Sequence, residues 1–131
     1  MNRTWLSALL IGFAVSAVAP VTRADDSDWV KYAEEANGNL HFYDPTHVEK
    51  RGVLRHVRNG IRYKTSLMGA FSYLRVSEIN CSEGTMKVLQ STFFTDEHWE
   101  RPAMGTDRNE KPAKQIKAGS AEERLAEIVC D

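Results

Sequence analysis

Apolar and polar positions alternate along two long segments in the second half of the chain. Residues 71–81 and 85–94 are rich in β-branched and aromatic side chains, which favour strands. Between them lies a short loop containing Gly84, where a left-handed backbone is expected. The pattern predicts a long β-hairpin. Because both of its faces carry apolar residues, we expect it in the middle of a sheet.

Shorter strand patterns precede this hairpin. Residues 29–34 and 40–43 flank Asn37-Gly38-Asn39, which is a turn signal, so the two segments predict a first hairpin. The dipeptide Asp44-Pro45 is expected to end the second of these strands, because proline cannot donate to a ladder.

A further hairpin is predicted around Asn59-Gly60, the strongest two-residue hairpin signal in the chain. Its strands would be residues 53–58 and 61–64, and residues 66–69 are expected to form a loop. Residues 95–113 then lose all regularity and carry prolines and many charges, which predicts an exposed, mobile excursion.

The C-terminus predicts a short strand followed by a helix. The strand covers residues 114–117, and Ser120 with Glu123 forms a capping box at the start of the helix. Apolar residues at helical spacing form a stripe that should lie on the sheet: Ala121, Leu125, Ile128 and Val129. The expected fold class is α+β, an antiparallel β-sheet of about five or six strands with one C-terminal α-helix packed on it.

The N-terminus reads as a signal peptide over residues 1–24. Arg3 precedes an apolar stretch of 14 residues, which is shorter than the roughly 20 residues of a membrane-spanning helix. Thr22-Arg23-Ala24 offers a cleavage site, so we expect a single domain over residues 25–131 and no transmembrane segment after cleavage. An uncleaved N-terminal anchor is the alternative.

Two cysteines, Cys81 and Cys130, lie in a chain expected to be exported, and an even pair there predicts a disulfide. Closing a loop of about 50 residues should stabilise the fold by roughly 4 kcal/mol. Residues 25–131 carry 15 basic and 18 acidic side chains, a net charge of −3. A charge this close to neutral argues against nucleic acid as the partner.

No grouping of residues predicts catalysis, a metal or a cofactor. His41, Asp44 and His47 are close in sequence, but their spacing matches no metal motif. Ser120 lies in no G-x-S-x-G elbow, and its capping role accounts for it. We therefore expect a binding protein and not an enzyme.

One segment has a strong charge bias. Between Glu49 and Lys64, six basic side chains accompany a single acid: Lys50, Arg51, Arg55, Arg58, Arg62 and Lys64. These residues predict a basic stripe that binds an acidic partner, either a protein surface or a sulfated polysaccharide. The alternative is a solvated outer sheet face whose charges discourage edge-to-edge aggregation.

Six short segments are spread over residues 29–131: Phe42-Tyr43-Asp44, Gly52-Val53, Ile79-Asn80-Cys81, Lys87-Val88-Leu89, residues 118–123 and Ile128-Val129-Cys130. With the spaced cysteines and the capped helix, they resemble the surface-adhesin protein E family of exported bacterial proteins. The resemblance implies a mainly antiparallel sheet with one attached C-terminal helix, no cofactor and no catalytic residues. It also implies a homodimer as one option and, in adhesin members, binding of host extracellular proteins.

The expected function is therefore that of an exported, non-catalytic binding protein, a surface adhesin for host extracellular proteins. It would reside in the periplasm or on the outer cell surface. A structural envelope protein without a soluble ligand is the first alternative, and a small periplasmic hydrolase is the last. Two positions depart from the family pattern, since Asn80 stands where an acidic residue is usual and His56 where an aromatic is common.

Overall fold

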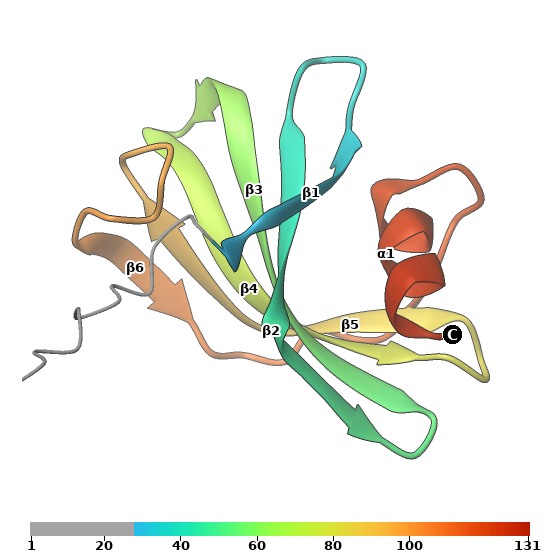
Figure 1. Ribbon diagram of the computed structural model, residues 1–131. Coiled ribbons are helices and arrows are strands. Elements are labelled where there is room, and N and C mark those ends of the chain that lie inside the picture. Colours follow the sequence, from blue (N-terminus) through green and yellow to red (C-terminus); the bar gives the residue numbers. More distant parts are fainter. Residues whose placement is uncertain (1–27) are drawn as a thin grey trace, which may run out of the picture.

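The computed structural model describes residues 28–131, so the predicted signal peptide lies outside the described residues. The described chain folds into a strongly twisted sheet with one helix against it (Figure 1). Its elements, in chain order, are β1 (Val30–Glu34), β2 (Leu40–Arg51), β3 (Leu54–Leu67), β4 (Ala70–Asn80), β5 (Thr85–Phe94), β6 (Ala103–Asp107), β7 (Lys114–Gln115) and α1 (Ala121–Val129).

The sheet is an antiparallel meander, in which each strand from β1 to β6 pairs with the next one along the chain. β7 pairs with the opposite end of β5 from β6, so the two short strands follow one another along the same edge of β5. This confirms the predicted α+β class, the central 71–94 hairpin and the short strand near residue 114.

The hairpin predicted at Asn59-Gly60 is wrong, because β3 runs straight through both residues. Each is paired with both neighbouring strands, and Asn59 is fully buried, where its side-chain oxygen accepts a hydrogen bond of 2.9 Å from the hydroxyl of Ser77. Gly60 lies under Trp99, and a Cβ there would come within 2.7 Å of the indole. Close approach and buried hydrogen bonding therefore account for a dipeptide that usually forms turns.

The predicted end of β2 at Asp44-Pro45 is also wrong. The strand continues to Arg51, and its pairing with β3 changes register between Tyr43 and Val48. Pro45 lies within that irregularity, where no ladder hydrogen bond is required of it, and the Asp44 carboxylate accepts the backbone N–H of Thr46 at 2.9 Å. The proline thus marks a bulge and not a strand end.

The excursion predicted for residues 95–113 is exposed over most of its length, but it is not irregular throughout. It contains β6, and it places Trp99 against the sheet. The loop before β6 is fixed by the Asp96 carboxylate, which accepts backbone N–H groups of His98, Glu100 and Arg101 at 3.0–3.2 Å.

The helix packs across one face of the sheet and is secured at both ends. At its start the Ser120 hydroxyl accepts the Glu123 N–H, and the Glu123 carboxylate accepts the Gly119 N–H, each at 3.1 Å. At its end Cys130 is bonded to Cys81, with the Cα atoms 5.6 Å apart. Both predictions are confirmed. The main core lies between helix and sheet and consists of Tyr32, Val57, Ile79, Met86, Leu125 and Val129.

Candidate functional site

The two faces of the sheet differ in what covers them. The covered face carries α1, whereas within residues 28–131 no helix lies on the other side, which we call the open face. Alternation along β3 assigns its residues to the two faces. Val57 packs in the same core cluster as Leu125 on the covered face, while Gly60 lies under Trp99 on the open face.

Arginines and aromatic rings gather on the open face in what we call the Arg–Trp cluster: Trp29, Phe42, Arg58, Arg62 and Trp99. The rings of Trp29 and Trp99 lie 4.8 Å apart between centroids. The Arg58 guanidinium carbon lies 5.6 Å from the Trp29 ring centre, and that of Arg62 lies 4.4 and 4.9 Å from Phe42 and Trp99. These distances are those of cation–π contacts, which hold the positive charges at fixed positions.

Trp99 is anchored at its indole N–H and through its ring. Its indole N–H donates to the Tyr73 carbonyl at 3.2 Å, and its ring rests on Gly60. The loop that presents it depends on Asp96. Burial would raise the pKa of this carboxyl, but the hydrogen bonds from three backbone N–H groups outweigh burial and hold the pKa below its usual value of 3.8.

Hollows flank Arg58 on the open face. One, of about 460 Å³, extends toward His47 on β2, and another, of about 330 Å³, extends toward Phe94 on β5. Arg58 and Val76 line both hollows. A half-buried arginine that rests on a tryptophan therefore stands between two depressions on the open face.

The six basic residues predicted as one stripe are separated by the structure. Arg58 and Arg62 share the Arg–Trp cluster, four residues apart or about 13 Å along a strand. Arg55 turns to the covered face, where it donates to the Val129 carbonyl at 2.9 Å. Lys50 and Arg51 are exposed where β2 ends, and Arg51 pairs with Glu49 at 3.0 Å.

Lys64 lies at the opposite end of β3. It covers Gly38, where a Cβ would meet the lysine side chain at 2.5 Å. Its backbone N–H donates to the Asn39 side chain at 3.1 Å. Lys64 therefore packs on the β1–β2 turn, away from Arg58.

A chain of ion pairs occupies the open face near the disulfide end. His56 Nε2 lies 2.8 Å from the Glu78 carboxylate, which lies 3.5 Å from Lys87, and Lys87 lies 3.5 Å from Glu110. Burial would raise the pKa of Glu78, but the hydrogen bond from His56 and the charge of Lys87 lower it overall. His56 thus has an acidic partner within this chain of ion pairs.

Two histidines of β2, His41 and His47, each lie beside one carboxylate. His47 Nδ1 lies 2.6 Å from Asp44, and His41 is buried with Nε2 3.2 Å from Glu35. Burial would raise the pKa of Asp44, but the hydrogen bonds from Thr46 and His47 lower it overall. Within residues 28–131, no three His, Cys, Asp or Glu side chains are grouped so as to hold a metal ion.

Known proteins share the sequence pattern and the fold of this chain. The model of the surface-adhesin protein E family matches residues 29–131, nearly all of the described chain. The chain belongs to the surface-adhesin protein E family. This confirms the resemblance found in the sequence.

Solved structures of Haemophilus influenzae protein E have the same fold as this family member. Three of them align with TM-scores of 0.60, 0.61 and 0.63. Each alignment covers 86% of this chain and 90–94% of the other, at 14% sequence identity. No curated protein sequence matches the chain. At this identity the structures establish the fold, and the side chains of the Arg–Trp cluster are described from this protein alone.

Sequence reasoning missed the tryptophans of this adhesin-family surface. Trp29 was expected only as the first residue of the strand over residues 29–34, and Trp99 lay in a segment expected to be irregular. The available signal was a large aromatic side chain isolated in a polar loop, directly after several charged residues. Such a residue rarely stays in solvent, because an indole left exposed loses the free energy of its burial.

Within residues 28–131, no helix is long and apolar enough to cross a membrane.

Proposed function

We propose that this protein is an exported, non-catalytic adhesin that binds host extracellular proteins through the open face of its sheet. Membership of the surface-adhesin protein E family supports export and adhesion. The observation that carries the binding site is the position of Arg58, which rests on Trp29 and lines both flanking hollows. The binding surface is the Arg–Trp cluster with those hollows.

The composition of the Arg–Trp cluster fits a protein partner. Trp and Arg are the side chains most enriched among residues that dominate binding energy at protein interfaces. Arg58, Arg62, Trp29 and Trp99 are each partly exposed, so a partner can reach them. The contact with Trp29 already restricts the Arg58 guanidinium, which lowers the entropy lost when a partner's carboxylate pairs with it.

A charge-reversal series tests the surface. The folded domain is assayed against immobilised host matrix proteins, with Arg58→Glu as the test and Lys50→Glu as the matched control. We expect Arg58→Glu to weaken binding at least tenfold, about 1.4 kcal/mol, and Lys50→Glu to change it little. Equal binding by both variants and the unchanged protein, with equal thermal unfolding, would remove the open face from the proposal.

Exposure of the protein on intact cells tests the adhesin role separately. Cells are treated with protease, and a known periplasmic protein serves as the control. Degradation of this protein while the control survives supports adhesion at the outer surface. Protection of both would leave a periplasmic binding protein or a structural envelope component, and adhesion would be rejected.

A further inference from the structure

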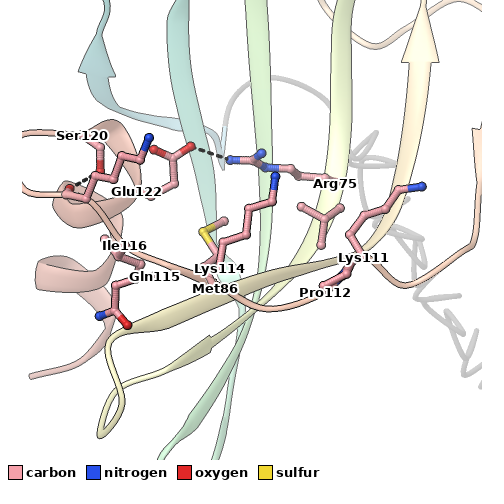
Figure 2. Close-up of a pocket in the computed structure, with 11 residues that line it drawn as sticks. Arg75, Met86, Lys111, Pro112, Lys114, Gln115, Ile116, Ser120 and Glu122 are labelled. Atoms are coloured by element: carbon pink, nitrogen blue, oxygen red, sulfur yellow. Dashed lines mark hydrogen bonds and ion pairs between the residues drawn. The ribbon is translucent and has the colours of Figure 1, made fainter.

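A pocket on the covered face lies away from the Arg–Trp cluster. It has a volume of about 330 Å³ and lies between β5, the N-terminal end of α1 and residues 111–117 (Figure 2). Met86 and Val88 form its apolar floor on β5, and Pro112 and Ile116 add further apolar wall. This volume is at the lower end of the range typical of small-molecule sites.

The polar side of the pocket is formed by a nearly buried arginine. The Arg75 side chain is 10% exposed, and its Nε has no hydrogen-bond partner. The contacts of its terminal nitrogens are long, 3.3 Å to the Tyr73 hydroxyl and 3.4 Å to the Glu122 carboxylate. A guanidinium carries five N–H donors and stays charged, so Arg75 retains donor capacity that Tyr73 and Glu122 do not use fully.

Lysines add to the positive charge around this arginine. The pocket lining carries four basic side chains and one acid, which are Arg75, Lys111, Lys114, Lys117 and Glu122. Figure 2 shows Lys114 extending toward the Arg75–Glu122 pair, whereas Lys111 points away from it. Lys111 already has a partner in Asp107 at 2.9 Å. Arg75 and Lys114 therefore place positive charge side by side at the pocket, and Glu122 is the single acid of the lining that can offset it.

We propose that this pocket binds a small organic carboxylate that carries an apolar chain. The carboxylate accepts hydrogen bonds from Arg75 and Lys114, and the chain lies on Met86 and Val88. An apolar floor beside excess positive charge requires both parts of such a ligand, because a bare anion would leave the floor uncovered and a neutral chain would leave the arginine donor unpaired. Carboxylate binding here does not require protein binding at the open face, although Arg75 also lines the hollow beside Phe94.

Three probes test the ligand class by calorimetric titration of the folded domain. Octanoate carries both parts, octanol carries the chain without the charge, and acetate carries the charge without the chain. We expect saturable binding of octanoate, with octanol and acetate at least tenfold weaker. Absence of octanoate binding would overturn the proposal, and so would octanol or acetate binding as tightly as octanoate.

Matched variants locate the site. Lys114→Gln should weaken octanoate about tenfold, because it removes a charge-assisted hydrogen bond, while Lys111→Gln should leave affinity unchanged. Val88→Phe narrows the floor and should weaken octanoate without removing a charge. Unchanged affinity in both Lys114→Gln and Val88→Phe, with native thermal unfolding, would show that octanoate binds elsewhere and would overturn the assignment. The NMR signals of residues 111–117, which line the pocket, should shift when octanoate binds.

Discussion

Neighbouring residues of β3 illustrate how different the two faces of this sheet are. Val57 is fully buried in the core on the covered face, whereas Arg58, one residue later, is half-exposed between two hollows. The covered face has a helix held to the sheet by a disulfide. On the open face, the indole of Trp99 rests on Gly60 and is presented by an exposed loop.

This contrast separates stability from the proposed recognition within one layer of strands. The covered face contains the main core, so its side chains are constrained by packing density and tolerate little change. The open face carries charged and aromatic side chains at the alternate positions, where substitution costs less folding free energy. A chain of this size can therefore vary its open face while the helix-covered core keeps the fold, and this fits a structural match at 14% identity.

Removal of the disulfide should have the largest effect. The Cys81→Ser/Cys130→Ser double variant should lose about 4 kcal/mol of unfolding free energy, because the bond closes a loop with a sequence separation of 49 residues. Chemical denaturation with and without reductant measures it. A loss below about 1 kcal/mol would mean that packing of α1 alone holds the covered face.

A side chain at Gly60 should have the next largest effect, and it should act on the open face. A methyl group there would lie 2.7 Å from the Trp99 ring, so Gly60→Ala should cost about 1–3 kcal/mol and displace the indole. Tryptophan fluorescence should shift toward that of a solvated ring. The control is Gly105→Ala, because a Cβ at Gly105 meets nothing within 4 Å. Equal stability of both variants would show that Trp99 does not hold the open face.

The sequence predicted the elements whose signals are local. The Ser120–Glu123 capping box and the apolar stripe behind it place α1 correctly, because hydrogen bonds at a helix start involve only near neighbours. The 71–94 hairpin was found for the same reason, since its turn at Gly84 joins adjacent segments. The disulfide followed from the count of cysteines and the expected compartment.

Errors arose where a distant contact outweighs a local preference. Asn59-Gly60 has the sequence of a turn, but Ser77 and Trp99, each many residues away, hold it within a strand. The basic stripe was divided for a related reason. Arg55 and Arg58 lie three apart on one continuous strand, so they point to opposite faces, and Arg55 donates to the Val129 carbonyl at the end of the distant helix.

Loss of the helix cap should have a smaller effect, limited to the covered face. Ser120→Ala removes the acceptor of the Glu123 N–H and should cost about 1 kcal/mol. Thermal unfolding measures it, and Ser82→Ala, at an exposed loop position, serves as the control. Fluorescence of Trp29 and Trp99 should stay native below the transition. A shift of that signal in Ser120→Ala would show that the two faces are coupled.

Acidification should have the smallest effect, and it should act first on the loop that presents Trp99. The pKa of Asp96 in the folded protein lies below the unfolded value of 3.8, so the unfolded state binds more protons as the pH falls through this range. The stabilisation by Asp96 is therefore complete well above pH 3.8 and is lost as the pH falls through the lower folded pKa. Tryptophan fluorescence should change over this interval, and Asp96→Asn should flatten the change because its side chain does not titrate. Asp107→Asn is the control, since that carboxyl also has a lowered pKa but pairs with Lys111. An identical pH profile in Asp96→Asn and the unchanged protein would mean that other groups hold Trp99 on the open face.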